Sequence, residues 1–210
     1  MKLLYQTHSP YARKVLVFAH ETGLARDIEV VHQETSPTRR NEEVYAQNPL
    51  GKVPVLLRAG APALFDSNVI CEYLDTLHSG RRLIPRAGEP RWLALRLQAV
   101  AQGLADAGGA YRWEAVRRPA ALCYAPLRDG YAEKLLAGYD WLERNLDDSA
   151  ELNVGHLALA TALSWLEFRD LPGFRIARDG SRRDRLITWF DAFDARPSMQ
   201  ATPLSGQTQD

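Results

Sequence analysis

The first eighty residues alternate between short apolar runs and longer amphipathic segments, which predicts strands and helices in turn. Residues 2–6 form a short β-rich run, and apolar positions at helical spacing follow from Pro10 until Gly23. A second β-rich run covers 28–32. Because a helix of about 13 residues fits the crossover between parallel strands, this order predicts a β-α-β unit at the start of a mixed sheet.

The same pattern completes a compact α/β unit near residue 80. Residues 38–47 are polar and weakly helical, and β-type runs cover 53–57 and 63–65. Helical spacing returns over 67–77. A segment rich in Gly, Pro and Arg then follows, with Leu83 and Ile84 as its apolar anchors, and it predicts an interdomain linker.

Beyond this linker the apolar positions keep the helical period. Helical patterns cover three long stretches, over 90–118, 126–146 and 154–168. A mixed α/β region followed by helices alone indicates two domains. We therefore predict an α/β domain over 1–79, a linker over 80–90 and an all-α domain over 91–210.

Composition and charge narrow the classes of function. The chain has 26 Lys and Arg against 26 Asp and Glu, so its net charge gives no support for a nucleic-acid partner. Hydrophobic residues make up 46% and charged residues 25%, as in ordinary globular proteins. No apolar run approaches the ~20 residues of a membrane helix, and Met1-Lys2 leads into no signal-peptide core, so we expect a cytoplasmic protein without membrane attachment.

The cysteines and histidines give no indication of a metal site. Cys71 and Cys123 lie far apart in apolar patterns, which favours buried, reduced, structural cysteines. None of the five histidines pairs with another at i, i+4 spacing. We expect neither a bound metal nor a disulfide framework.

The first candidate motif, residues 9–15, lies where a strand ends and a helix begins. Ser9 there is typical of an N-cap, a role worth about 1 kcal/mol by itself. A helix N-terminus also stabilises an anion through its unpaired N–H groups. A serine at that position can in addition donate its hydroxyl proton to a bound thiolate.

The second candidate motif, residues 48–56, places Pro54 at the start of a strand. This is an ordinary position for a turn proline, but an X-Pro bond can also be cis. A cis bond would turn the N–H and C=O of Val53 outward, where they can pair with the backbone of a bound peptide.

The third candidate motif, residues 65–70, is again a strand end that leads into a helix. Asp66 and Ser67 are typical capping residues. The same helix start can bind a carboxylate through its N–H groups, and Asp66 can hold an ammonium. All three motifs are expected at one end of the small sheet.

These three motifs in this order, followed by a helical domain, resemble the cytosolic glutathione transferases, and most closely a bacterial serine-type member. Residues 158–169 and 195–198 extend the resemblance over nearly the whole chain. It implies a thioredoxin-like α/β N-terminal domain that binds glutathione as co-substrate. It also implies an all-α C-terminal domain that completes a pocket for a hydrophobic electrophilic small molecule, and a homodimer.

The resemblance assigns glutathione-binding roles residue by residue. Pro54 would be a cis-proline, and the backbone of Val53 would pair with the cysteinyl group. Asp66 would lie near the γ-glutamyl ammonium and Ser67 near its carboxylate. The remaining assignments are Lys52, with Arg39 or Arg40, for the glycyl carboxylate, and Leu104, Gly108 and Tyr111 for the electrophile pocket.

Ser9 occupies the position where serine-type members carry the catalytic hydroxyl. Lowering a thiol pKa from about 8.5 by roughly two units takes about 2.7 kcal/mol. A hydrogen bond to a charged group contributes about 1.5–3 kcal/mol and a helix dipole about 0.3–1 kcal/mol, which together suffice. The residues that compete for this role are Tyr5, Thr7, His8 and Tyr11.

One position departs from the family pattern. The helix that begins near 154 usually has a capping box of Ser or Thr with Asp three residues later, whereas this chain has Asn153 and His156. Asn153 can still cap, but we expect His156 not to supply the reciprocal acceptor.

Three other functions remain open on the same fold. One is a glutathione-dependent lyase or ether-cleaving activity. Thiol transfer is disfavoured, because Ser9 and Ala12 stand where a redox relative has cysteines. The third is a non-catalytic regulatory protein, against which the intact segment 52–54 and the pair Asp66-Ser67 argue.

Overall fold

The computed structural model describes residues 1–147 and 151–207; residues 148–150 and 208–210, which the predicted helical domain includes, lie outside the described part. The chain forms two compact units. Unit 1 comprises Met1–Trp92 together with Pro197–Asp210, and unit 2 comprises Leu93–Arg196. This division differs from the predicted one, because both the linker and the C-terminal segment join the α/β unit.

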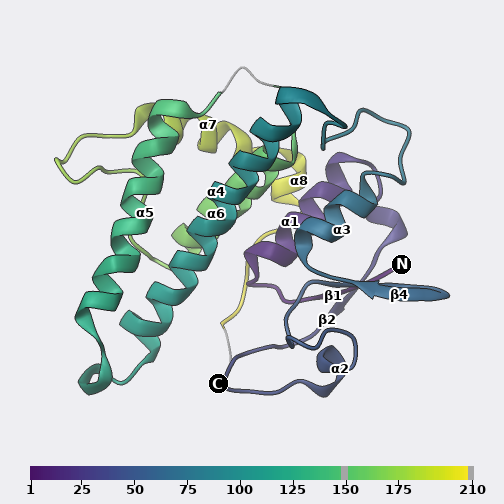
Figure 1. The fold of residues 1–210 in the computed structure, drawn as a ribbon, viewed down its shortest axis with the longest axis horizontal. Coiled ribbons are helices and arrows are strands. Elements are labelled where there is room, and N and C mark those ends of the chain that lie inside the picture. Colours follow the sequence, from purple (N-terminus) through teal and green to yellow (C-terminus); the bar gives the residue numbers. More distant parts are fainter. Residues whose placement is uncertain (148–150, 208–210) are drawn as a thin grey trace. The chain divides into compact units, whose positions relative to one another are not determined.

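Unit 1 is built on a four-stranded mixed sheet (Figure 1). Its strands are β1 (Lys2–Tyr5), β2 (Glu29–His32), β3 (Val55–Arg58) and β4 (Ala61–Leu64), in the order β2-β1-β3-β4. β1 runs parallel to β2 and antiparallel to β3, and β4 runs antiparallel to β3. The predicted mixed sheet that begins with a parallel β-α-β unit is therefore confirmed.

Two helices, α1 (Pro10–Glu21) and α3 (Ser67–Leu74), lie side by side against this sheet (Figure 1). Their inward faces carry fully buried apolar side chains, among them Val15, Phe18 and Ile70. The weak helix predicted over 38–47 is a single turn, α2 (Glu42–Tyr45), and a 3-10 turn, η1 (Ala25–Asp27), precedes β2.

The strand register brings three loops to one edge of the sheet. Leu4 near the end of β1 pairs with Val55 at the start of β3, and Leu64 at the end of β4 pairs with Leu56. Because β3 runs opposite to both neighbours, the chain leaves β1 and β4 at the edge where it enters β3. The three candidate motifs therefore share one end of the sheet, as predicted.

The predicted linker is an ordered part of unit 1. Leu83 and Ile84 are buried, as their role of apolar anchors requires. Their N–H groups donate to the two carboxylate oxygens of Asp75, at 2.9 and 3.2 Å. Asp75 is itself 2% exposed, so the linker is held to the end of α3 by buried hydrogen bonds.

The C-terminal segment joins unit 1 through α8 (Pro197–Gln200), which packs on α1. The buried Arg13 of α1 donates from Nη2 to the carbonyl oxygen of Met199 at 3.1 Å. Ser198 donates from Oγ to Glu21 Oε1 at 2.5 Å. These contacts join residues far apart in sequence, and they explain why the predicted domain boundary differs from the observed one.

Unit 2 is helical, as predicted. Its elements are most of α4 (Gly88–Arg112), a π-helical turn η2 (Trp113–Arg117), a 3-10 turn η3 (Ala120–Leu122), α5 (Ala125–Asn145), α6 (Val154–Phe168) and α7 (Asp184–Asp194). Buried residues occur all around α6. Gly155 permits a close approach to α4, because a Cβ atom there would lie 2.6 Å from the carbonyl oxygen of Ala94.

The first turn of α6 corrects the sequence expectation about its cap. The side chain of Asn153 accepts from the Gly155 N–H at 2.9 Å, and the Asn153 N–H donates to His156 Nδ1 at 3.3 Å. The capping box is thus complete, because a neutral imidazole nitrogen is an acceptor just as a carboxylate oxygen is. Burial lowers the pKa of His156, against a smaller opposing effect of its hydrogen bond to the Asp147 backbone.

This cap predicts a pH-dependent stability. Below about pH 6.5 the unfolded chain binds a proton at His156 more readily than the folded chain does. The free energy of unfolding therefore decreases as the pH is lowered. The loss amounts to about 1.4 kcal/mol per unit of pKa difference. Urea unfolding at about pH 7.5 and pH 5.5 tests this, with His156→Gln as the non-titrating control. An equal pH dependence in both proteins would contradict it.

Candidate functional site

Ser9 caps α1 at the edge of the sheet where the three motifs meet. Its Oγ accepts from the Ala12 N–H at 3.2 Å, and Pro10 follows as the first helical residue. The side chain is 7% exposed. Within residues 1–147 and 151–207 no acceptor takes the Ser9 hydroxyl proton, so the group that caps the helix also has a proton to offer a ligand.

The four competing residues differ from Ser9 in their surroundings. Thr7 Oγ1 donates to the carbonyl oxygen of Ser205 at 2.8 Å. The His8 ring is buried, with Nε2 at 3.9 Å from Glu34 Oε2. Burial raises the pKa of Tyr5, so its phenol loses its proton only at a higher pH than an exposed tyrosine. Tyr11 lies half-buried within α1.

The loop before β3 is held by the buried Asn48. Its Nδ2 donates to the carbonyl oxygen of Lys52 at 2.9 Å, and its Oδ1 accepts from the Leu50 N–H at 3.0 Å. Gly51 has a φ of +62°, and a Cβ there would lie 2.2 Å from Cε2 of Tyr45. The loop thus requires glycine at this position both for its conformation and for the ring beside it.

The Val53–Pro54 peptide bond is cis. The side chain of Val53 packs into the core with Leu4, Val44 and Val55. In the part of the chain that the structure describes, neither the N–H nor the C=O of Val53 has a hydrogen-bond partner. Such a backbone edge suits the addition of a short extended peptide.

The third motif is the start of α3. Asp66 is the N-cap, and its side chain accepts from the N–H groups of Asn68 and Val69 at 3.0 and 3.5 Å. The Phe65–Asp66 peptide bond is also cis. Ser67 is 1% exposed, yet among the described residues nothing pairs with its N–H or its hydroxyl. Two donors and an exposed carboxylate therefore lie next to each other.

A buried lysine that the motif analysis did not single out supports this helix start. Lys14 Nζ donates to Asn68 Oδ1 at 2.6 Å, and the side-chain nitrogen Nδ2 of Asn68 donates to Asp66 Oδ2 at 3.5 Å. Burial lowers the pKa of Lys14, while Cys71 and Asp66 raise it. The sequence signal was present, because Lys14 falls among the buried apolar positions of α1, where a charged group needs a partner.

The basic residues predicted for the glycyl end are exposed or already engaged. Lys52 is exposed. Arg40 lies 3.8 Å above the Tyr45 ring and donates to Glu42 Oε1 at 2.6 Å. Arg39 and Arg40 both line a cavity of about 380 Å³, whose other walls come from Glu34, Asn41, Glu42 and Glu43. Their glutathione contacts stay predictions.

The residues proposed for the electrophile pocket lie on α4. Leu104 is buried against Gly138 of α5, and a Cβ at Gly108 would lie 2.4 Å from Leu166 of α6. Tyr111 is half-buried. The first two thus pack between the helices of unit 2, and the pocket stays a prediction.

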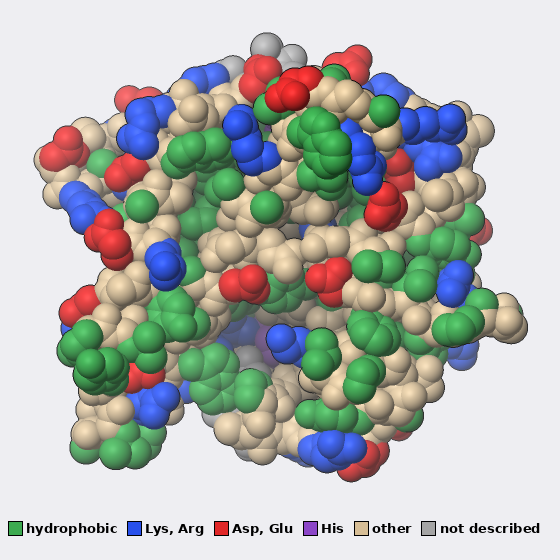
Figure 2. All heavy atoms as spheres, in the orientation of Figure 1, with side chains coloured by type: hydrophobic (Ala, Val, Ile, Leu, Met, Phe, Trp, Pro, Cys, Tyr) green, Lys and Arg blue, Asp and Glu red, His purple; other side chains and the backbone are tan. Residues whose placement is uncertain are grey.

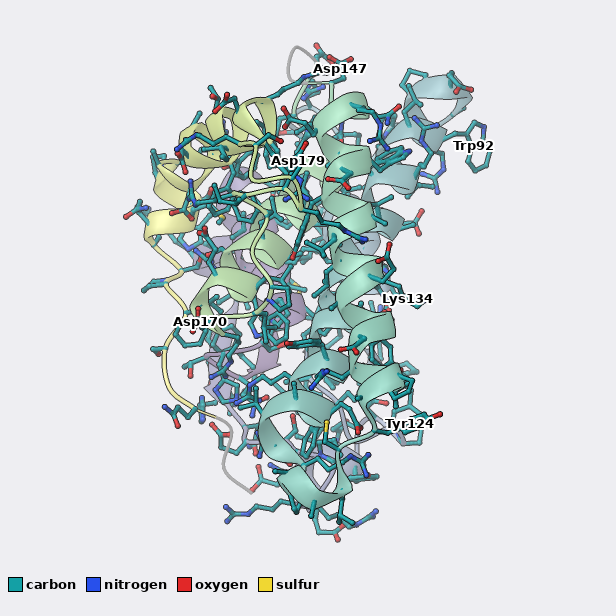
Figure 3. The ribbon with its side chains drawn as sticks, turned by 90° about the vertical axis from the view of Figure 1, so that its left-hand side faces the viewer. Trp92, Tyr124, Lys134, Asp147, Asp170 and Asp179 are labelled. Carbon is teal, nitrogen blue, oxygen red and sulfur yellow. The ribbon has the colours of Figure 1, made fainter. Side chains whose placement is uncertain are left out.

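Unit 2 exposes apolar side chains where α4 passes into α5. Val116, Leu122 and Tyr124 are each more than 60% exposed. Figure 2 shows hydrophobic side chains gathered at this end, and Figure 3 shows Tyr124 there at the start of α5.

The two cysteines differ in burial. Cys71 is buried, and burial raises its pKa to about 12. Cys123 is half-buried, so the expectation of a buried cysteine is wrong there. Residues 1–147 and 151–207 include no group of three His, Cys, Asp or Glu able to hold a metal ion. In the same residues no helix has the length and apolar character needed to cross a membrane.

The sheet order, the two helices packed on it and the proline at the start of β3 define unit 1 as a thioredoxin-like domain, and helices follow it in the chain. The family model of the glutathione S-transferase N-terminal domain matches residues 8–77.

Relatives and solved structures extend this match over most of the chain. The GST-like protein YibF of Escherichia coli is 31% identical over 85% of this chain and 88% of its own. A glutathione transferase family member from Pseudomonas fluorescens with bound glutathione is 34% identical, with a TM-score of 0.90, over 98% of this chain and 99% of its own. A second structure of a P. fluorescens family member, with bound S-(propanoic acid)-glutathione, has a TM-score of 0.86 at 34% identity over 98% of this chain and 100% of its own. The chain therefore belongs to the glutathione S-transferase family.

The Asn48 loop gives a direct test of how the site edge is built. Asn48→Ala leaves the Lys52 C=O and the Leu50 N–H without their buried partner, so the free energy of unfolding should fall by about 2–3 kcal/mol. Chemical denaturation measures it, with the exposed Asn145→Ala as the control. A loss below about 0.5 kcal/mol would contradict the role given to Asn48.

Proposed function

We propose that this protein is a glutathione transferase in which Ser9 stabilises the thiolate of bound glutathione for attack on an electrophilic small molecule. The observation that carries the proposal is the meeting of three ligand-ready groups at one sheet edge. These are the Ser9 hydroxyl, the unpaired backbone of Val53 and the start of α3 at Asp66 and Ser67.

Each of these groups matches one part of the glutathione peptide. The N–H and C=O of Val53 pair with the backbone of the cysteinyl residue, beside Pro54. Asp66 accepts from the γ-glutamyl ammonium, and the Ser67 N–H and hydroxyl donate to the γ-glutamyl carboxylate. Lys52, with Arg39 or Arg40, neutralises the glycyl carboxylate.

The chemistry that follows is nucleophilic attack by sulfur. The thiol of glutathione loses its proton to solvent, and the thiolate accepts the Ser9 O–H at the positive end of α1. The sulfur lone pair then forms a bond to the electrophilic carbon, and the leaving group departs with its own electron pair. The nucleophile belongs to glutathione, since the protein contributes position and charge stabilisation.

Two findings support this proposal. The P. fluorescens structures hold glutathione and a glutathione whose sulfur carries a propanoic acid group. The high pKa of the buried Cys71 argues against thiol transfer through a protein disulfide. We propose that Leu104, Gly108 and Tyr111 of α4 line the electrophile pocket. Tyr111 is half-buried, so part of it is accessible to a ligand.

We also propose a cytoplasmic homodimer. Unit 1 exposes apolar side chains at Val69, Leu77 and Trp92, which are 45%, 43% and 62% exposed. Figure 3 shows Trp92 projecting outward near the start of α4. Such side chains suit a contact with a second copy of the chain.

Glutathione affinity tests the binding half. Asp66→Ala should weaken the affinity measured by calorimetry on the order of a hundredfold, because it removes the carboxylate that pairs with the γ-glutamyl ammonium. Lys14→Met should weaken it less, about fivefold, by releasing Asn68. Glu29→Gln on β2 is the matched control. If Asp66→Ala and the wild type bind glutathione with equal affinity, glutathione does not bind at the start of α3.

Conjugation of a generic aryl halide tests the catalytic half. Ser9→Ala should lower kcat/KM on the order of ten- to a hundredfold and raise the pKa of the bound thiol by about 1–2 units. Ser9→Thr keeps both the hydroxyl and the cap and serves as the control. If Ser9→Ala leaves rate and thiol pKa unchanged, another residue stabilises the thiolate.

A further inference from the structure

The turn that delivers Ser9 from the sheet to α1 is held from two sides. It consists of Gln6, Thr7, His8 and Ser9, and the Ser9 N–H donates to the carbonyl oxygen of Gln6 at 3.0 Å. The backbone conformation of Thr7 and His8, the two central residues of the turn, sets where the Ser9 hydroxyl lies relative to the sheet edge. Contacts that fix these residues therefore also fix the hydroxyl.

The first side is the loop after β2. Gln6 Nε2 donates to Glu34 Oε2 at 2.8 Å and to the carbonyl oxygen of Thr35 at 3.1 Å. The hydroxyl of Thr35 donates back to Gln6 Oε1 at 3.2 Å. The first residue of the turn is thus fixed by three hydrogen bonds.

The second side is the C-terminal tail, residues 202–206. Thr7 Oγ1 donates to the carbonyl oxygen of Ser205 at 2.8 Å, and the Ser205 N–H donates to the carbonyl oxygen of Thr7 at 3.1 Å. Gly206 follows with a φ of +80°, and a Cβ there would lie 3.3 Å from Thr7 Oγ1. The tail therefore lies directly against the central part of the turn.

The tail is also anchored to the helix that Ser9 caps. Thr202 Oγ1 donates to the carbonyl oxygen of Ser198 at 2.9 Å, and Arg13 Nε donates to Thr202 Oγ1 at 3.4 Å. Arg13 lies one helical turn after Ser9, and both Arg13 and Thr202 are buried. The tail thus contacts α1 at Arg13 and the preceding turn at Thr7, on either side of Ser9 in sequence.

We propose that the C-terminal tail positions the catalytic turn, with Ser205 and Thr7 as positioning residues that act through Ser9. The inference rests on the proposed role of Ser9 in stabilising the thiolate. A hydrogen bond to a thiolate depends steeply on distance and angle, so a turn that samples other conformations gives up part of that stabilisation. The tail restricts the turn through its two hydrogen bonds with Thr7.

Two variants remove these bonds from opposite sides. Thr7→Val removes the hydroxyl at nearly constant shape, and Ser205→Pro removes the N–H that Thr7 accepts. Thr7→Ser keeps the hydroxyl, and Ser205→Ala keeps the backbone, so these are the matched controls. The readouts are the pKa of the glutathione thiol on the protein, from its ultraviolet absorbance, kcat/KM for conjugation, and amide exchange at Ser9.

Each of the two variants should lower kcat/KM about fivefold and raise the thiol pKa by about 0.7 unit, which is the same free energy. The KM for glutathione should stay unchanged and amide exchange at Ser9 should quicken, while both controls behave as wild type. If Thr7→Val does not fold, Ser205→Pro decides alone.

Two results would overturn the proposal, and they are distinguishable. If the wild-type protein lowers the thiol pKa of glutathione and both Ser205→Pro and Thr7→Val lower it equally, the role of the tail is refuted and that of Ser9 is not. A wild-type protein that leaves the thiol pKa of glutathione unchanged would refute the proposed function and the role of the tail together.

Discussion

The antiparallel pairing of β1 with β3 is the constraint on which the arrangement of the site depends. Leu3 opposite Leu56 and Leu4 opposite Val55 fix the register, and all four side chains are buried. Leu3 and Leu4 point to opposite faces of the sheet and both are buried, so a shift by one residue would place each of them on the other face, against side chains that it does not fit. Because β4 also runs opposite to β3, this register places the end of β1, the start of β3 and the end of β4 at one edge. The starts of α1 and α3 meet there because they follow β1 and β4 directly.

Buried polar groups then hold the loops of that edge in place. Asn48 closes the loop before β3, and Lys14 fixes the amide of Asn68 beside the N-cap of α3. Arg13 fixes the C-terminal segment to α1. Each of these side chains is costly to bury alone and becomes stabilising only with its partners in place. The backbone of Val53, which we propose pairs with glutathione, in contrast has neither its N–H nor its C=O bonded to any described residue.

The sequence predicted the elements and the shared sheet edge because both follow from local patterns. The helix over 154–168 has the predicted bounds, since apolar residues recur on more than one side of it from Val154 to Phe168. Contacts with distant partners leave no such pattern. Nothing periodic indicates that Ser205 bonds to Thr7, so the sequence pattern groups the tail with the helices, whereas its contacts group it with unit 1. The family pattern gave a wrong expectation for the cap of α6. It has a carboxylate at the position of His156, where a neutral imidazole accepts the same hydrogen bond.

A crystal structure of the complex with glutathione would show whether the sulfur of glutathione lies against Ser9, the capping residue of α1. We expect the sulfur within hydrogen-bond distance of Ser9 Oγ, with the cysteinyl backbone paired to both the N–H and the C=O of Val53. A complex with the sulfur against Tyr5 or His8, or with the backbone of Val53 unpaired, would contradict it.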